Sequence, residues 1–344
     1  MPVYRLTVAY DGTRFHGFQR QIENAALTAK TSNGYNNPVK KRPVYEPDGT
    51  RKNCCISVQE VLELVILQDL YPNQTTADEV CLKFSGRTDK GVHARGQTVT
   101  VNLPTMTTTA GSSSSSEEEQ QPNVWKLRQS FNSRLPVDIS VVAVACLGHS
   151  TTFDPRRDVV QKRYSYTLKY QRKLSEKDQK LLGGPLNSIR HALNDPPCLW
   201  VCPWALDDTH LPKLVERLQG THDYSAFVHK AVRKERENTL TVSSIQFTVM
   251  NTRADFYYYE TNGDGPGKEE PIAVPVDFVT ARFEFAAKGF RRTMLRNLVG
   301  YCVDVCRGLE GVPAVDQVFD AEIGPKARIN AAPASGLCLE SVSS

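Results

Sequence analysis

The sequence predicts an α+β fold made of two ferredoxin-like, or RRM-like, halves that share one mainly antiparallel central sheet with a basic cleft between them. The chain has 344 residues, enough for two domains that each bury a core. Apolar periodicity over residues 1–148 gives the order strand, helix, strand, strand, helix, strand. Residues 149–344 again alternate strands with helices. We therefore expect an N-terminal half over 1–148 and a C-terminal half over 149–344.

The elements of the first half follow from local patterns. Residues 4–10 alternate apolar and polar side chains, as a half-buried strand does. Ser57 and Glu60 form a capping box, and the residues after them repeat apolar side chains on one helical face. The other elements expected in this half are strands at 80–84, 98–103 and 139–145 and a helix at 124–131.

The second half shows the same alternation. A strand is expected from Lys162 to Tyr170, and Leu211, Leu214 and Leu218 predict a helix that ends at Gly220. Met294, Leu298 and Cys302 form the apolar face of a later helix, which is expected to be the main helix of this half. The remaining strands are expected at 239–249, 278–285 and 336–342.

Four stretches break these patterns and are interpreted as insertions or excursions. Residues 22–55 are polar and irregular, and their basic run Lys40-Lys41-Arg42 contacts RNA or is a solvated patch. Residues 105–121 hold five consecutive Ser and three Glu, and a segment of this composition cannot bury a core, so disorder is expected. Residues 171–205 are expected to be irregular, and the glycine-rich residues 262–268 to be flexible.

Composition restricts the class of protein. The net charge is only +4, so a role with nucleic acid would depend on a local basic surface. No apolar run of membrane-spanning length occurs, and the first residues already have a strand pattern, so neither a membrane span nor a signal peptide is expected. Nine scattered cysteines are typical of reduced thiols, which favours a cytoplasmic or nuclear location and leaves an organelle open.

Two cysteine pairs have helical spacing, Cys198/Cys202 and Cys302/Cys306. A zinc site needs a second close-spaced pair of ligands, and no convincing pattern of that kind accompanies either pair. Buried free cysteines behave as small apolar side chains, so packing is the expected role. Neither a metal nor an organic cofactor is expected.

The loop Gly86-Arg87-Thr88-Asp89-Lys90-Gly91 lies between two predicted strands. Its two glycines allow a tight turn, and it presents one carboxylate between two cations. An Asp in such a loop is most often a turn residue that bonds its own backbone. Loops mounted on a rigid sheet are also where catalytic side chains commonly lie, so Asp89 is a candidate for either role.

The longer string resolves this choice. G-R-T-D-K-G-V-H-A-R-G-Q around Asp89, and Y-D-G-T-R-F-H-G-F-Q at residues 10–19, resemble the TruA-type tRNA pseudouridine synthases. About five ordered motifs carry the resemblance over nearly the whole chain outside the insertions. It implies isomerisation of uridine to pseudouridine in the anticodon arm of tRNA, around nucleotides 38–40, and by analogy a homodimer. Lys90, Phe18 and the insertions depart from the bacterial pattern, so the choice of target uridines and RNAs stays open.

The resemblance also assigns roles to residues. Asp89 would act at the sugar, by attack on C1′ or by removal of the 2′ proton, and the sequence does not choose between these. Arg296 would keep Asp89 ionised, although an ordinary surface helix Arg is the plain alternative. Tyr164 would stack on the uracil and help move the C5 proton, with a core aromatic as its alternative.

The flipped uridine leaves a space in the RNA stack, which Arg87 would fill or hold open. The surface that receives the RNA backbone would be basic. The residues expected there are Arg14, Arg20, Lys162, Arg163, Arg291 and Arg292, together with Arg156 and Arg157.

Two other functions are weighed against this one. A ferredoxin-like pair with basic loops could be a non-catalytic RNA-binding member of the same fold, but binding alone does not require Asp89, Tyr164 and Arg296 together. A hydrolase built on Ser85, Asp89 and His93 would place all three groups on one short loop, and no further motif supports it.

Overall fold

A computed structural model describes residues 1–20, 57–71, 80, 82–104, 123–181, 196, 198–229, 237–259, 272–320 and 322–344. The chain forms two compact units. Met1–Val160 and Glu340–Ser344 make up unit 1, and Gln161–Leu339 make up unit 2. The halves expected from the sequence, 1–148 and 149–344, were defined by repeated topology rather than by contacts, and they stay a prediction.

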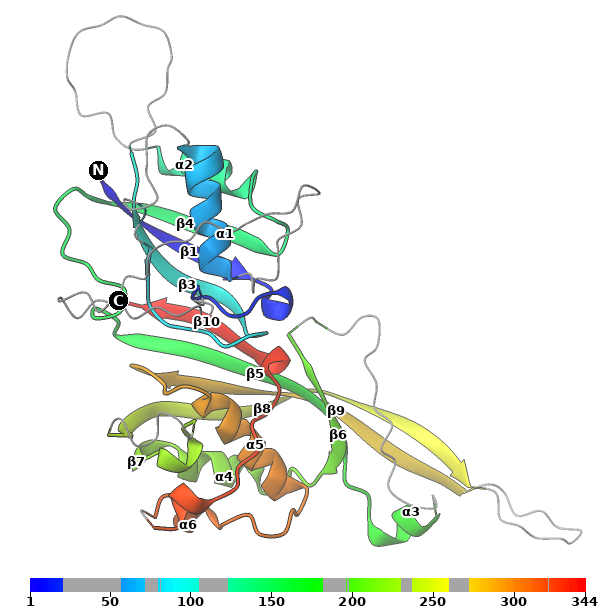
Figure 1. Ribbon diagram of the computed structural model, residues 1–344. Helices are drawn as coiled ribbons and strands as arrows, with labels where there is room; N and C mark the ends of the chain where they lie inside the picture. The colour runs from blue at the N-terminus through cyan, green and yellow to red at the C-terminus, as the bar shows by residue number, and fades with distance from the viewer. Residues whose placement is uncertain are drawn as a thin grey trace, which may run out of the picture. The chain divides into compact units, whose positions relative to one another are not determined.

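Unit 1 contains an antiparallel sheet with strand order β4-β1-β3 and the short β2 paired to β3 (Figure 1). Every second residue of β1 is buried, which is the alternation that the sequence predicts for one covered sheet face. The strands are β1 Val3–Tyr10, β2 Lys83–Phe84, β3 His93–Asn102 and β4 Ile139–Gly148.

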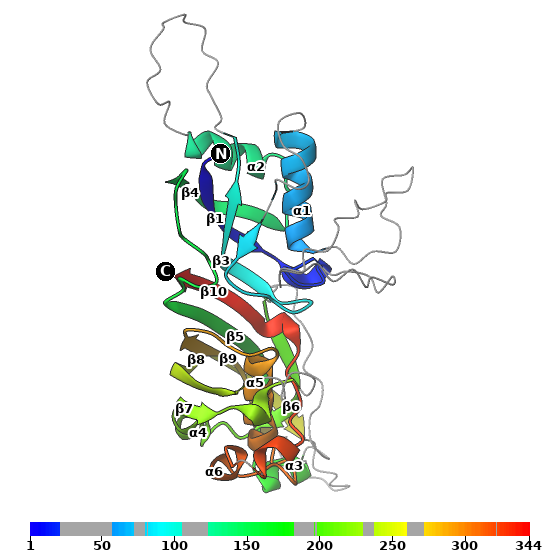
Figure 2. The same cartoon turned by 60° about the vertical axis from the view of Figure 1, so that its left-hand side comes forward.

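Two helices pack in unit 1, α1 Val58–Leu64 and α2 Val124–Asn132 (Figures 1 and 2). The predicted capping box is present, because Ser57 accepts from the Glu60 backbone N–H and Glu60 accepts from that of Ser57. The helix then continues as a π-helical turn over Val65–Leu70. The predicted order strand, helix, strand, strand, helix, strand is therefore found, although β2 is shorter than the expected 80–84.

Unit 2 contains the strand order β5-β9-β8-β7, with β6 paired to β5 in parallel. Its strands are β5 Gln161–Arg172, β6 Trp200–Leu206, β7 Gly220–Asp223, β8 Thr239–Tyr259 and β9 Ile272–Ala287. Its helices are α3 Glu176–Leu181, α4 Leu211–Leu218, α5 Met294–Cys306 and α6 Val315–Val318. The last strand, β10 Leu337–Ser343, has its first three residues in unit 2 and the rest in unit 1.

Short 3₁₀ turns complete the described elements, at Gly12–Arg14, Ser225–Phe227, Gly324–Lys326 and Ala334–Gly336. The predicted fold class is confirmed, since the chain combines helices with mainly antiparallel strands. In the described part of the chain, no helix combines the length and the apolar character that a membrane span requires.

The prediction of irregular structure over 171–205 is wrong at its ends. Residues Glu176–Leu181 are helical and Trp200–Leu206 form β6. Pro203 argues against a strand, because proline cannot donate a ladder hydrogen bond. The strand nonetheless forms at the edge of β5, where the register shifts between Lys169 and Gln171. Most of residues 182–197 lies outside the described residues, as do the predicted insertions 22–55, 105–121 and 262–268.

Helix α5 is the buried centre of unit 2. Met294, Leu298 and Cys302, its predicted apolar face, are each at most 2% exposed. Burial extends around most of the helix, so it packs on more than one side. Gly300 permits one of these contacts, because a Cβ there would lie 1.7 Å from the Asn330 carbonyl oxygen.

A carboxylate ties the end of β5 to the segment before α4. Asp208 accepts from Arg172 Nε at 3.0 Å and from the Tyr170 hydroxyl at 2.6 Å. Burial would raise the pKa of Asp208, but the hydrogen bonds from Arg172 and Tyr170 outweigh it and hold the pKa below its usual value. Asp208 therefore stabilises unit 2 in its ionised form.

Replacement of Asp208 by Asn should destabilise the protein by about 1–3 kcal/mol at neutral pH, because Arg172 and Tyr170 lose a charged acceptor. The folded pKa of Asp208 lies below 3.8, so its contribution is complete above that pH and is lost as the pH falls through the folded pKa. Urea midpoints at pH 7 and at pH 3.5 measure this. Asp207→Asn is the matched control, since the hydrogen bonds of Asp207 are to nearby Thr209. Equal midpoints for the two variants at pH 7 would contradict the assignment.

Candidate active site

The loop that carries Asp89 is fixed at its first residues by β3. The Ser85 backbone N–H donates to the Thr98 carbonyl at 3.0 Å, and its hydroxyl donates to Gln97 Oε1 at 2.7 Å. Gln97 is fully buried and its Nε2 donates to the Gly86 carbonyl at 2.6 Å. The G-Q at the end of the sequence motif therefore holds the start of the loop.

Thr88 fixes the centre of the loop to the N-terminal motif. Its hydroxyl lies 2.8 Å from the Tyr10 hydroxyl and accepts from the Phe18 backbone N–H at 3.1 Å. Tyr10, Phe18 and Phe84 also form a run of ring contacts, with centroids 6.0 and 4.8 Å apart. The conformation of the residue directly before Asp89 is thus set by residues about 70 positions away in the sequence.

Two glycines let the segments meet this closely. Gly17 has φ +91°, and a Cβ there would lie 2.3 Å from the Thr88 carbonyl oxygen. Gly91 has φ +78°, and its N–H donates to the Phe15 carbonyl at 3.2 Å. The Val92 N–H closes the turn by donating to the Asp89 carbonyl at 3.2 Å.

The far end of the loop rests on the turn after β1. The Gly12 N–H donates to His93 Nδ1 at 3.3 Å, and the same nitrogen lies 3.2 Å from Asp11 Oδ1. Burial would raise the pKa of Asp11, but hydrogen bonds from Thr13 and the charge effects of His93 and Arg14 leave the pKa lowered. These contacts give His93 a part in holding the loop.

Asp89 itself is half-buried, between exposed Arg87 and exposed Lys90. Burial lowers the pKa of His16, and the positive charge of nearby Lys90 lowers it further. The loop thus presents one carboxylate among cations on a backbone fixed at both ends and in the middle.

In unit 2, Tyr164 lies on β5 opposite Phe285 and is 8% exposed. Its ring meets Phe290 edge-on, with centroids 5.5 Å apart. Phe290 belongs to the K-G-F-R-R segment before α5. Both expected roles, stacking platform and core aromatic, are compatible with this burial.

Arg296 is held near the start of α5 by a two-way contact with Ala332. Its Nε donates to the Ala332 carbonyl at 2.7 Å, and its own carbonyl accepts from the Ala332 N–H at 2.9 Å. The Tyr166 hydroxyl donates to the next carbonyl, that of Pro333, at 2.8 Å. Burial raises the pKa of Tyr166, and Arg296 opposes part of that rise. The sequence patterns did not predict this contact between Arg296 and Ala332.

The turn before Arg296 is strained. Thr293 has φ +59°, the one positive φ of a non-glycine among the described residues. Asn297 Nδ2 donates to the Phe227 carbonyl at 2.6 Å, and the His229 N–H donates to the Arg292 carbonyl at 3.3 Å. Such strain persists only where surrounding contacts over-determine the backbone, and it is common at functional sites.

The predicted RNA-binding cations differ in their surroundings. Arg14 is 69% exposed and pairs with Asp138 at 2.6 Å. Arg20 is 22% exposed and pairs with Glu63. Exposed Arg163 donates to Gln161 at 3.1 Å, and Arg291 donates to the Glu237 carbonyl at 2.6 Å. Two further members of the set are placed by the structure as follows: Lys162 is half-buried on β5, and Arg292 is exposed before α5.

Comparison with known proteins gives consistent results. A family model described as tRNA pseudouridine synthase matches residues 214–343. Over 98% of its length, the chain is 24% identical to tRNA pseudouridine synthase A of Thermodesulfovibrio yellowstonii and covers 98% of that protein. The corresponding protein of Nitratidesulfovibrio vulgaris is 26% identical, with 98% of this chain and 95% of that one covered. The tRNA pseudouridine synthase A 1 of Protochlamydia amoebophila is 25% identical, with 98% of this chain and 95% of that protein covered.

Over nearly its whole length, this chain is similar to tRNA pseudouridine synthases. The resemblance predicted from the motifs is confirmed, and the comparisons support the predicted enzyme class, pseudouridine synthase. They oppose the hydrolase alternative. The structure gives Ser85 and His93 hydrogen bonds to Gln97 and Gly12 that hold the synthase loop in place.

The cysteines of unit 2 are compatible with packing. Burial raises the pKa of Cys202 to about 11 and that of Cys306 to about 12, so these thiols stay protonated. Within the described ranges, no group of three or more His, Cys, Asp or Glu side chains could hold a metal ion.

Replacement of Gly17 by Ala should slow the reaction on the order of 10²-fold, because the new Cβ must displace the Thr88 carbonyl and with it the Asp89 loop. The measurement is single-turnover pseudouridine formation at saturating tRNA, alongside the melting temperature. Gly148→Ala is the control: its φ is also positive, at +82°, but a Cβ there meets nothing within 4 Å. If both variants lose the same activity, backbone strain rather than the loop contact is responsible.

Proposed function

We propose that this chain isomerises uridine to pseudouridine in the anticodon arm of tRNA, around nucleotides 38–40, with Asp89 as the group that acts at the sugar. The observation that carries the proposal is the support of the Asp89 loop. Thr88 and Gln97 hold this loop by hydrogen bonds and Gly17 packs closely against it, so the backbone that carries the half-buried Asp89 has a fixed position. Preorganisation of this kind is what a catalytic carboxylate needs.

The reaction is an isomerisation, so no atom is gained or lost overall. The bond between C1′ and N1 breaks, the uracil turns, and a bond between C1′ and C5 forms. The C5 proton then leaves and N1 carries one instead. One carboxylate at the sugar and one group that helps the C5 proton leave are sufficient for these steps. Asp89 would supply the first, by attack on C1′ or by removal of the 2′ proton.

Arg296 and Tyr164 would complete the site. Arg296 is held by Ala332 through its Nε and its backbone, so its guanidinium is fixed near the start of α5, and a guanidinium is suited to pairing with a carboxylate. Tyr164 is mostly buried, its ring lies perpendicular to that of Phe290, and an aromatic ring of this kind is what stacks on a base. Arg87, exposed two residues before Asp89, would enter the space that the flipped uridine leaves.

The remaining cations would bind the RNA backbone. Arg163 and Arg292 are exposed and suited to phosphate contact. Arg14 is exposed too, but it would have to exchange Asp138 for a phosphate. Arg20 is the least suited, because Glu63 already pairs with it and most of its surface is covered. Pseudouridine mapping across all RNAs, with and without this protein, tests the target positions. Size-exclusion chromatography tests the expected homodimer.

Asp89→Asn should abolish product formation and leave tRNA affinity within a few-fold of wild type, because one carboxylate carries the chemistry while binding is spread over many cations. Tritium release from uridine labelled at C5 measures the first, and filter binding the second. Asp69→Asn is the matched control, an exposed carboxylate in the π-helical turn of the same unit. Turnover by Asp89→Asn close to wild type would disprove the catalytic assignment.

Two substitutions of Tyr164 separate its proposed roles. If the ring only stacks, Tyr164→Phe should keep nearly full activity. Tyr164→Leu should then react about 10- to 100-fold more slowly, since stacking is worth roughly 1–3 kcal/mol. If the hydroxyl helps the C5 proton leave, Tyr164→Phe should lose on the order of 10²–10⁴-fold. We expect the second result. Single-turnover kinetics with tRNA deuterated at C5 measure it, and a Phe variant as fast as wild type would remove the hydroxyl from the mechanism.

A further inference from the structure

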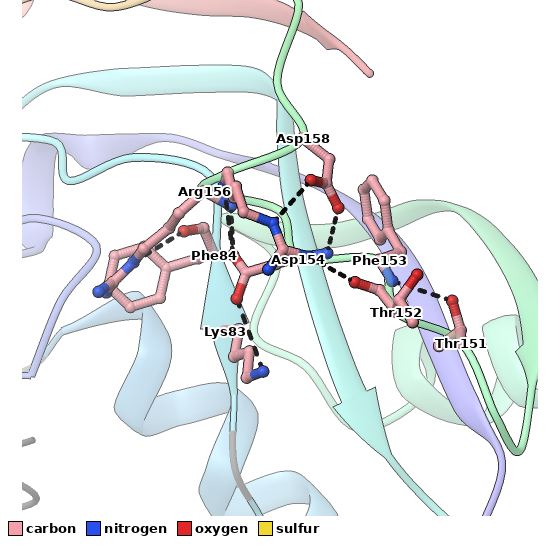
Figure 3. Close-up of polar contacts among 9 residues, drawn as sticks. Lys83, Phe84, Thr151, Thr152, Phe153, Asp154, Arg156 and Asp158 are labelled. Atoms are coloured by element: carbon pink, nitrogen blue, oxygen red, sulfur yellow. Dashed lines mark hydrogen bonds and ion pairs between the residues drawn. The ribbon is translucent and has the colours of Figure 1, made fainter.

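The segment before β5 holds Arg156 in a fixed position against β2. The Arg156 backbone N–H donates to Asp154 Oδ1 at 2.8 Å, and the Asp154 N–H donates to Asp158 Oδ2 at 2.7 Å. Lys83 on β2 lies 3.6 Å from the Asp154 carboxylate and ties the segment to the strand (Figure 3). The backbone at Arg156 is therefore set by its own neighbours before any RNA binds.

The guanidinium of Arg156 lies over the ring of Phe84, 4.7 Å from its centroid, and Nε donates to the Phe84 carbonyl at 3.4 Å (Figure 3). Phe84 is 3% exposed, and its ring also contacts Phe18 at 4.8 Å. A cation over an aromatic face keeps its full charge but loses side-chain freedom. Arg156 itself remains exposed.

The surroundings of the Arg156 guanidinium differ from those of the Arg157 guanidinium. Arg157 Nε pairs with Asp158 at 3.0 Å, and its Nη2 donates to the Thr152 carbonyl at 2.8 Å. Among the residues that the structure describes, no carboxylate pairs with Arg156. Two adjacent exposed arginines thus differ in one respect, whether a carboxylate compensates the guanidinium.

The position of Phe84 relates this cation to the catalytic loop. Phe84 is the last residue of β2 and directly precedes Ser85, where the loop begins. Its ring neighbour Phe18 donates its N–H to Thr88, next to Asp89. A ligand held by Arg156 would therefore lie against the support of the loop that carries Asp89.

We infer that Arg156 binds a backbone phosphate of the substrate RNA, pre-organised for that contact by its stacking on Phe84. The inference rests on the proposed function and deepens it, because it names one cation of unit 1 as an RNA contact and excludes its neighbour. A guanidinium with its Nε and one face engaged still presents two Nη groups, the geometry that a phosphate oxygen pair accepts.

The test compares four proteins: wild type, Arg156→Ala, Arg156→Gln and Arg157→Ala. Arg156→Gln removes the charge but keeps part of the side chain that lies over the Phe84 ring. Filter binding of unmodified tRNA over a series of KCl concentrations gives the affinity and its salt dependence. Melting temperatures and pseudouridine formation are measured on the same proteins.

Both Arg156 variants should raise the Kd on the order of tenfold at low salt. They should also reduce the steepness of log K against log salt by about 0.7–0.9, the loss of one phosphate contact. Arg157→Ala should stay within about twofold of wild type with an unchanged slope.

Arg156 variants that bind like Arg157→Ala would overturn this inference, as would a lowered melting temperature with an unchanged salt slope, which indicates a structural role only. A wild-type protein that forms no pseudouridine would instead overturn the proposed function. The affinity comparison would still decide the role of Arg156.

Discussion

The hydrogen bonds of one threonine hydroxyl support the arrangement of the candidate site in unit 1. Thr88 contacts the Tyr10 hydroxyl and accepts from the Phe18 N–H, so the residue before Asp89 is fixed by the N-terminal motif. Gly17 is required beside it because any Cβ would meet the Thr88 carbonyl. The two strongest sequence motifs therefore form one structural unit, in which the first motif positions the loop that carries the proposed catalytic residue of the second.

Unit 2 supports its own candidate residues in a comparable way. Arg296 exchanges two hydrogen bonds with Ala332, and Tyr166 bonds the next carbonyl. The strained Thr293 precedes this helix and is held by Asn297 and its neighbours. In both units the backbone near a proposed functional side chain is fixed by segments distant in sequence. The side chain therefore loses less conformational entropy when it reaches the geometry that the reaction needs.

The cations that are expected to bind RNA differ in whether a carboxylate pairs with them. Arg20 and Arg157 are compensated by Glu63 and Asp158, whereas Arg156 stacks on an aromatic ring. Because the net charge is only +4, binding of RNA would depend on local cations such as Arg156. Cations without a carboxylate partner should thus contribute more to affinity than those that are paired.

The sequence alone determined the alternation of strands and helices, the capping box at Ser57, the apolar face of α5 and the polar loop around Asp89, because each depends on spacing between near neighbours. Tertiary structure decided that Thr88 meets Tyr10 and Phe18, that β6 forms despite Pro203, and that Glu63 neutralises Arg20. These outcomes depend on partners brought together from distant positions. The sequence around a charged or hydroxyl side chain does not identify the group that this side chain contacts in the folded chain.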